Sequence, residues 1–190
     1  DGAINQLDKD LERHIKEYLS IRCGMQEIFT YPWMDETYVN AILQSTDGIL
    51  SLSTPPSPAE RFIRSSLLPN LCKAVAKNER YYGDFAIFET AQVFRDENYT
   101  TPYDEREKLP SQRKNVAGAF VSAGKDVTAL FRKAKGVVEM MPRYTHMESY
   151  TLKQAEKPVW ADEVVWLNIY LGEQHIGDLA LLSKRVSMAC

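Results

Sequence analysis

The segment RSSLLPNL, Arg64 to Leu71, constrains the fold more than any other part of the chain, because it predicts where a strand ends and a helix begins. Ser66 is placed to cap that helix by accepting hydrogen bonds from unpaired backbone N–H groups, and Pro69 falls in the first turn, where its missing N–H costs little. Apolar residues then recur on one face at helical spacing: Leu67, Leu68, Leu71 and Val75. The segment therefore predicts a capped helix from Ser66 to Tyr82 that packs on the core.

The composition is that of an ordinary globular domain. The chain has 190 residues, of which 44% are apolar and 26% charged, and 23 basic against 26 acidic side chains give a net charge of −3. We therefore expect one domain, 1–190, without the basic excess that phosphate binding to nucleic acid usually requires. Because the chain opens without Met and stops at KRVSMAC, inside what reads as a helix, we expect a domain excised from a longer polypeptide.

The sequence favours a reduced, cytoplasmic environment. No stretch approaches the roughly 20 apolar residues that would cross a bilayer, and the first residues are too polar for a secretory signal. Cys23, Cys72 and Cys190 lack the C-x-x-C spacing of zinc or redox sites, so we interpret them as reduced thiols. The three histidines lie far apart in sequence, and we expect an incidental structural role for each.

Periodicity predicts an α+β domain in which helices alternate with antiparallel hairpins. We expect helices over 7–22, ended by Gly24, from a cap at Asp35 to Ile42, over 66–82 and from a cap at Asp126 to Met141. Strands are predicted at 26–33, 49–53, 84–94, 115–122, 147–154, 164–171 and 175–182. The polar segment 95–114 is predicted to be an exposed hairpin loop. Gly118 is interpreted as a point of close backbone approach, whereas Gly136 is equally compatible with tight packing and with a tolerated glycine.

Several common catalytic patterns are absent from the sequence. There is no G-x-S-x-G elbow, no G-x-x-x-x-G-K-[ST] phosphate loop and no G-x-G-x-x-G after a strand. Hydrolases of that type and the common ATP-binding folds are therefore not expected. We assign no catalytic residue and no metal site.

Four motifs, in consecutive order, carry a family resemblance. RSSLLPNLCKAVAKN and IFETAQVF, Ile87 to Phe94, resemble R-T-S-L-L-P-G-L-L-x-A-L-x-x-N and I-F-E-x-x-x-V-F of the catalytic-like module in the β chain of phenylalanine–tRNA ligases. GMQEIFTYPW resembles the same family's G-Y-x-E-V-x-T-Y-S, and KGVVEMM resembles K-G-x-V-E-x-L-L. The chain departs from the family pattern at Asn70 and Ala91, where the family often has glycine, and in its terminal third.

The resemblance implies a fold similar to the class II aminoacyl-tRNA synthetase core, an antiparallel sheet flanked by helices, with the catalytic equipment lost. It implies a structural role that supports ATP-dependent attachment of phenylalanine to tRNA(Phe), without a cofactor on this domain. In this family the α chain binds ATP, Mg²⁺ and phenylalanine, the chains assemble as (αβ)₂, and other modules of the β chain contact tRNA. The expected partner is therefore the α chain.

The same resemblance suggests candidate site residues. We expect the strand end and the helix that follows to lie at the contact with the α chain, through Arg64, Ser65, Ser66, Leu67, Leu68, Pro69 and Leu71. FRDE, Phe94 to Glu97, matches the F-R-x-E pattern in which class II synthetases place an arginine against ATP, so Arg95 is a weak candidate for an ATP site. The second, glycine-rich arginine motif is absent.

Two alternatives stay open. The chain is also compatible with a free-standing paralogue that binds RNA or another protein. The third reading is an independent class II-like ligase that uses Arg95.

Overall fold

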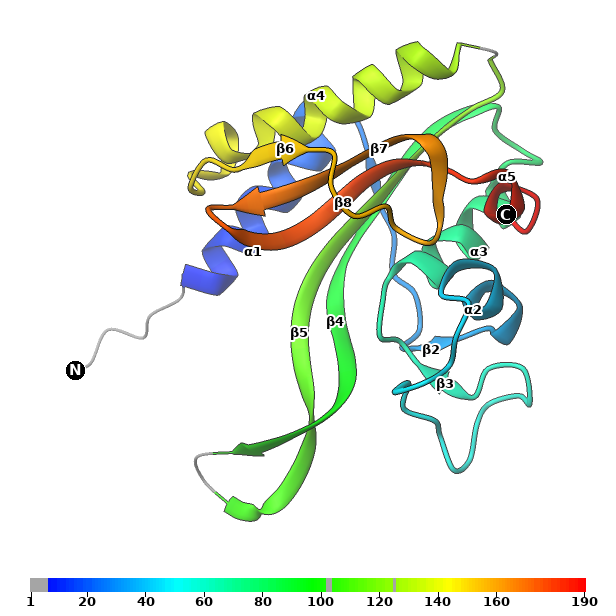
Figure 1. Ribbon diagram of the computed structural model, residues 1–190, viewed down its shortest axis with the longest axis vertical. Coiled ribbons are helices and arrows are strands. Elements are labelled where there is room, and N and C mark those ends of the chain that lie inside the picture. The colour runs from blue at the N-terminus through cyan, green and yellow to red at the C-terminus, as the bar shows by residue number, and fades with distance from the viewer. Residues whose placement is uncertain (1–6, 102–103, 125) are drawn as a thin grey trace.

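The computed structural model describes residues 7–101, 104–124 and 126–190, and for 97–101 and 104–109 it describes the backbone alone. Figure 1 shows a long β-hairpin arm that carries helices and a second sheet at one end. The helices are α1 (Leu7–Glu17), which continues into the π-helical turn η1 (Tyr18–Arg22), α2 (Glu36–Ile42), α3 (Leu68–Asn78), α4 (Val127–Thr145) and α5 (Lys184–Ser187). The strands are β1 (Gln26–Glu27), β2 (Trp33–Met34), β3 (Phe62–Ile63), β4 (Asp84–Thr101), β5 (Asp104–Ser122), β6 (Thr151–Lys153), β7 (Ala161–Leu171) and β8 (Gln174–Leu182).

The strands form antiparallel ladders with one exception. One sheet has the order β1-β4-β5, a second has the order β6-β7-β8, and β2 pairs with β3. Among the strands that the structure describes, only β1 runs parallel to its neighbour, with Gln26 opposite Ile87 on β4. The α+β class and the mainly antiparallel sheet flanked by helices are therefore confirmed, and the parallel β1 makes the first sheet a mixed one.

The helix starts predicted at Asp35 and Asp126 agree with the structure because their caps form. Asp35 accepts a hydrogen bond from the Thr37 N–H at 3.0 Å, and Asp126 accepts one from the Ala129 N–H at 2.9 Å. Ser66 Oγ accepts the Leu68 N–H at 3.2 Å, but the N-cap position of α3 is Leu67, and the helix runs from Leu68 to Asn78 and not from Ser66 to Tyr82. Each short polar side chain thus satisfies a backbone donor that the first helical turn leaves unpaired.

The interpretation of 95–114 as a loop is wrong. Apart from residues 102 and 103, which lie outside the described residues, the hydrogen-bonded ladder of β4 and β5 continues through this segment, with Arg95 opposite Ser111 and Thr100 opposite Lys108. Alternating polar residues do not prevent an antiparallel ladder when water reaches the strands, so polarity alone was a poor signal for a loop. The arm that projects downward in Figure 1 is this extended hairpin.

Three shorter strand predictions also need correction. Within 49–53 only Ser51 makes a bridge, to Phe62, so the expected strand does not form. The strand predicted over 26–33 divides into β1 and β2, because the backbone between them bonds to side chains as well as to strand backbone. The strand expected over 147–154 is reduced to β6.

The two glycines singled out in the sequence differ in their surroundings. A Cβ at Gly118 on β5 would lie 2.9 Å from the Met25 methyl group and 3.3 Å from the Ile87 carbonyl oxygen. Gly136 on α4 has no neighbour within 4 Å of such a Cβ among the residues that the structure describes, so tight packing does not account for it. Gly118 therefore marks a close approach of the β4 backbone, as predicted, but the Met25 side chain lies closer still.

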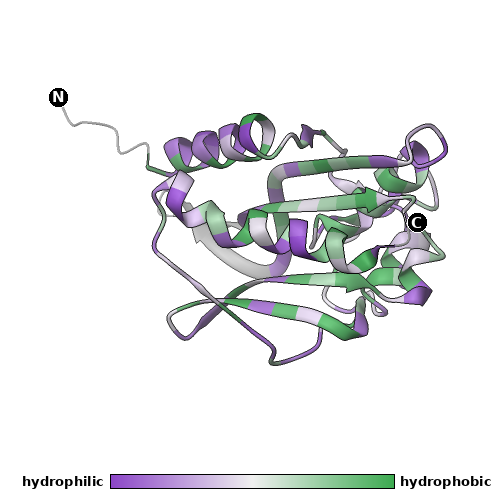
Figure 2. Ribbon diagram, turned by 90° about the horizontal axis from the view of Figure 1, so that it is seen from above, coloured by the Kyte–Doolittle hydropathy of each residue, from purple (hydrophilic) through white to green (hydrophobic). Residues whose placement is uncertain are grey.

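The core lies between β4 and the helices that cover it. Figure 2 shows apolar residues concentrated along the strands, while α1 is mostly hydrophilic. Phe88 is fully buried with Tyr18, Leu19 and Met25 on one side of β4, and Ile87 packs with Leu71 and Val75 of α3 on the other. The RSSLLPNL helix is thus a core helix, and β4 is buried on both faces in its first half.

Candidate functional site: a buried Arg64–Glu89 network beneath exposed aromatic residues

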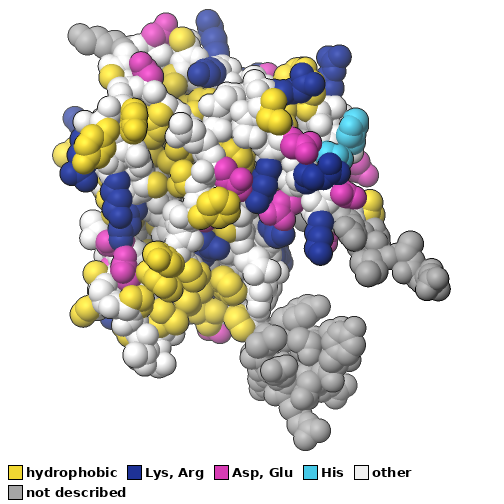
Figure 3. All heavy atoms as spheres, turned by 180° about the vertical axis from the view of Figure 1, so that it is seen from behind, with side chains coloured by type: hydrophobic (Ala, Val, Ile, Leu, Met, Phe, Trp, Pro, Cys, Tyr) yellow, Lys and Arg dark blue, Asp and Glu magenta, His cyan; other side chains and the backbone are white. Residues whose placement is uncertain are grey.

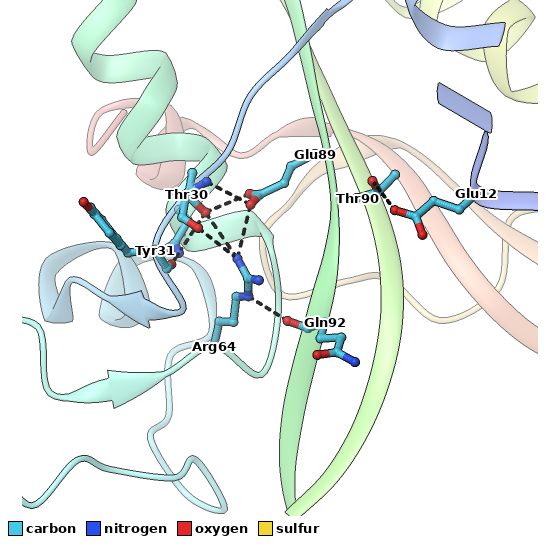
Figure 4. Close-up of polar contacts among 8 residues, drawn as sticks. Glu12, Thr30, Tyr31, Arg64, Glu89, Thr90 and Gln92 are labelled. Atoms are coloured by element: carbon cyan, nitrogen blue, oxygen red, sulfur yellow. Dashed lines mark hydrogen bonds and ion pairs between the residues drawn. The ribbon is translucent and has the colours of Figure 1, made fainter. Parts of the chain in front are cut away.

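Glu89 is a buried carboxylate on β4, with 2% of its surface exposed. Its Oε1 accepts hydrogen bonds from the Thr30 N–H at 2.9 Å and from Arg64 Nη1 at 3.2 Å, and its Oε2 accepts the Thr30 hydroxyl at 2.8 Å (Figure 4). A buried charge is tolerated only when it is paired and hydrogen-bonded, and these three bonds meet that condition. The carboxylate therefore accepts the Thr30 N–H, which in a regular ladder would bond to a carbonyl of the neighbouring strand.

Arg64 connects this carboxylate to two further segments. The side chain is 10% exposed, its Nε donates to the Gln92 carbonyl at 2.6 Å, and its Nη1 donates to the Thr30 carbonyl at 3.3 Å. Its backbone N–H donates to the Pro32 carbonyl, and its carbonyl accepts the Phe94 N–H, each at 2.8 Å. One residue of the RSSLLPNL motif thus joins the 28–32 segment to β4 with both backbone and side chain.

Asn70, in the first turn of α3, completes the network. Its side-chain amide donates to the Tyr31 carbonyl at 2.7 Å and to the Thr30 hydroxyl at 3.2 Å. The departure from the glycine of the resembling family is therefore a buried polar contact in this chain. Three elements, β4, the strand end before α3 and α3 itself, hold the backbone of residues 30 and 31.

The segment held in this way presents aromatic side chains to solvent. Phe29 is 79% exposed and Tyr31 is 70% exposed, and the Tyr31 ring stacks on Trp33 with centroids 4.5 Å apart. Because neighbouring side chains in extended backbone point to opposite sides, Thr30 faces Glu89 while Tyr31 points away from it (Figure 4). Apolar side chains also gather into a patch on the face shown in Figure 3.

A second polar group fixes α1 against the same strand. Glu12 accepts hydrogen bonds from the Thr90 hydroxyl at 3.4 Å and from the Lys114 ammonium, and it pairs with Lys16 at 3.1 Å. Lys114 holds the pKa of the Glu12 carboxyl below its usual value, more than partial burial raises it. Lys16 bridges onward to Glu27 at 2.8 Å, which ties α1 to β1.

The predicted contact residues divide into buried and partly exposed groups. Arg64, Leu67, Pro69 and Leu71 are buried within this chain, whereas Ser65, Ser66 and Leu68 are half-buried. The motif therefore offers a partner little surface of its own. The contact of this motif with an α chain stays a prediction. Within the motif, only the three half-buried residues have surface with which to make such a contact.

Arg95, the weak ATP candidate, is exposed on β4 at the start of the arm, beyond Val93. On β5 the register places Arg113 opposite Val93, so these two arginines are diagonal neighbours on one face of the ladder. No group of His, Cys, Asp or Glu able to hold a metal ion is found among the described residues. ATP binding at Arg95 stays a prediction.

The sequence did not single out Glu89, Thr30 or Gln92 as individual residues. A usable signal existed for Glu89, because a charged residue in a strand expected to be buried on both faces requires a partner. A groove of about 850 Å³ was also missed, and its lining includes His14, Arg22, Arg143 and His146. His14 and His146, far apart in sequence, meet edge to face with ring centroids 5.7 Å apart.

The fold places the chain among proteins with an aminoacyl-tRNA synthetase architecture of class II. The pyrrolysyl-tRNA synthetase PylSc of Desulfitobacterium hafniense superposes with a TM-score of 0.66 over 90% of this chain and 56% of that chain, at 14% sequence identity. A second crystal structure of the pyrrolysyl-tRNA synthetase from this organism gives the same score and covers 57% of that chain. At this identity the likeness concerns the fold alone.

Comparison of the sequence with protein families identifies the family of the chain. The profile of the phenylalanyl tRNA synthetase beta chain CLM domain matches residues 2–190, and the chain belongs to that family. It is 22% identical to the phenylalanine–tRNA ligase beta subunit of Borreliella afzelii over 97% of this chain and 30% of that protein. The corresponding subunit of Carboxydothermus hydrogenoformans is 25% identical over 93% of this chain and 22% of that protein. The chain thus spans less than a third of the length of these relatives.

No helix among the described residues is long and apolar enough to cross a membrane.

Proposed function

We propose that this domain is a non-catalytic structural part of a phenylalanine–tRNA ligase β chain, and that it packs against the catalytic α chain. The α chain would bind ATP, Mg²⁺ and phenylalanine in a cytoplasmic (αβ)₂ assembly, and other modules of the β chain would contact tRNA. Membership of the β-chain family supports this role. No cofactor is expected on the domain itself.

The observation that carries the proposal is the pairing of exposed aromatic side chains with a rigid buried anchor. Interfaces that assemble permanently are apolar, and aromatic residues in a fixed conformation contribute most to them because little entropy is lost on binding. Phe29 and Tyr31 meet this description, since the backbone beneath them bonds to Glu89, Arg64 and Asn70. In this arrangement Arg64 positions the contact segment and need not touch the partner.

Co-purification with the α chain encoded in the same genome tests the proposal. Phe29→Ser together with Tyr31→Ser removes the two exposed rings and leaves the buried network in place, so we expect at least about a tenfold loss of α-chain binding. The matched control is Tyr81→Ser with Tyr82→Ser, because these rings are 72% and 60% exposed at another position. Circular dichroism establishes that both variants fold.

The outcome separates the role of the segment from a general loss of apolar surface. Unchanged binding by the Phe29/Tyr31 variant, or an equal loss in the Tyr81/Tyr82 control, would contradict the assignment of this segment to the contact. Aminoacylation of tRNA(Phe) by the purified complex should fall in parallel with binding. ATP–pyrophosphate exchange by the isolated chain would instead support the independent ligase that uses Arg95.

A further inference from the structure

Two of the three cysteines lie together where the end of the chain packs against α3. Cys72, on α3, is 6% exposed, and Cys190, just after α5, is half-buried. Both belong to an apolar cluster built around Ile42 and Val186. Arg185 holds α5 in place by donating to the carbonyls of Ala41 and Val159. This pair was not predicted, because residues 72 and 190 lie far apart in the sequence.

The two thiols interact, and their pKa values shift in opposite directions. A hydrogen bond from the Cys72 thiol lowers the pKa of Cys190, and the same contact together with burial raises the pKa of Cys72. The thiolate is the nucleophilic form of cysteine, so we expect Cys190, the less buried of the two, to react first. Cys72 is then held beside it as an uncharged thiol.

We propose that Cys190 and Cys72 are a redox-sensitive pair that forms a reversible disulfide when the protein meets a hydroperoxide. The Cys190 thiolate attacks a peroxide oxygen, an S–O bond forms as the O–O bond breaks, and the leaving hydroxide or alkoxide takes up a proton to become water or an alcohol. The sulfur of Cys72 then attacks that of Cys190, an S–S bond forms as the S–O bond breaks, and hydroxide leaves with the Cys72 proton as water. Two thiols lose two electrons and two protons, and the peroxide is reduced.

The bond would join the end of the chain to the helix that starts at the Arg64 network. It closes a loop of about 120 residues, and because long loops lose most chain entropy when closed, it should raise the midpoint of thermal unfolding by roughly 5–15 °C. Reduction by a dithiol reverses the shift. This proposal is independent of the role proposed for the aromatic segment.

Peptide mapping tests the pair directly. The 190-residue chain is treated with a small molar excess of hydrogen peroxide, free thiols are alkylated in denaturant, and the protein is digested with trypsin. Cleavage after Arg64, Lys73 and Arg185 places Cys72 in peptide 65–73 and Cys190 in peptide 186–190. We expect these two peptides to be linked, with a mass two hydrogens below their sum, and to separate after treatment with dithiothreitol.

Three variants make the result decisive. Cys72→Ala should leave Cys190 as a sulfenic acid that dimedone traps, and Cys190→Ala should abolish both the link and the trapping. Cys23→Ala is the matched control, since Cys23 is half-buried beside Tyr18 and should leave the link and the thermal shift unchanged. The proposal is overturned if the 65–73 and 186–190 peptides stay unlinked, or if Cys23 is oxidised before Cys190.

Discussion

Removal of the Glu89 carboxylate is the sharpest test of the buried network. Glu89→Ala leaves two donors without an acceptor, the Thr30 N–H and the Thr30 hydroxyl. Arg64 Nη1 keeps its bond to the Thr30 carbonyl, but the Arg64 cation is left buried without its carboxylate. Breaking a buried ion pair by removing one partner costs about 3–5 kcal/mol, because the remaining charge stays desolvated. That is a large share of the roughly 5–15 kcal/mol that stabilises a typical domain.

Urea denaturation followed by circular dichroism measures this cost. With a slope of about 2 kcal/mol per molar urea, a loss of 4 kcal/mol moves the unfolding midpoint down by about 2 M. Arg64→Met should cost a similar amount, because it leaves the Glu89 carboxylate buried without its cation. Arg64→Met combined with Glu89→Met should cost at least about 2 kcal/mol less than the sum of the single variants, since neither charge is then left alone.

An exposed pair on the same molecule supplies the control. Arg61 and Glu36 lie 3.0 Å apart with 49% and 38% of their side chains exposed, so Glu36→Ala should cost less than about 1 kcal/mol. If Glu89→Ala costs no more than Glu36→Ala, the buried network does not hold the 28–32 segment. The same result would remove the rigid anchor from the proposed function.

Three further substitutions probe the glycines and the position of α1. Gly118→Ala should destabilise the fold by about 1–2 kcal/mol, because its Cβ would lie 2.9 Å from Met25 and 3.3 Å from the Ile87 carbonyl, and thermal unfolding measures this loss. Gly136→Ala should instead stabilise by about 0.5–1 kcal/mol through helix propensity, and a loss of stability there would show packing at this face of α4. For Glu12, whose folded pKa is lowered, the contribution to stability is present above the unfolded value near 4.5 and disappears as pH falls through the folded pKa. Glu12→Gln should therefore lower stability at pH 7 by less than about 1 kcal/mol and make little difference at pH 2, and an equal loss at both pH values would contradict the ion pair as the cause.

The sequence predicted well those helices that are determined by residues a few positions apart. The capping residues Asp35 and Asp126 and the apolar period of α3 depend on neighbours a few positions away, and these elements formed as expected. The arm was predicted wrongly because residues 95–101 are held by ladder bonds to 104–111, and backbone pairing of this kind leaves no apolar pattern in a polar segment. Contacts between distant residues, such as His14 with His146, left no pattern at all.

The two motifs of the candidate site could be predicted from local sequence, but the contact between them could not. RSSLLPNL and IFETAQVF were recognised as two separate motifs, and the structure shows that Arg64 of the first and Glu89 of the second form one ion pair at 3.2 Å. Sequence order alone cannot show that two motifs meet, nor that Thr30 lies between them. A buried charge in each motif was the available sign that they belong together.

This pairing lets one segment belong to the core and, in the proposed function, also position a contact surface. Leu67 and Leu71 fix α3 in the core, and Arg64, directly before the helix, bonds through its backbone to Pro32 and Phe94. A displacement of α3 would therefore move the carbonyl partners of Arg64 and Asn70, and with them the backbone that carries Tyr31. Leu67 and Leu71 set the position of the helix, and the hydrogen bonds of Arg64 and Asn70 hold the aromatic segment at a fixed place relative to it. A partner surface that recognises Tyr31 would in this way depend on residues it never touches.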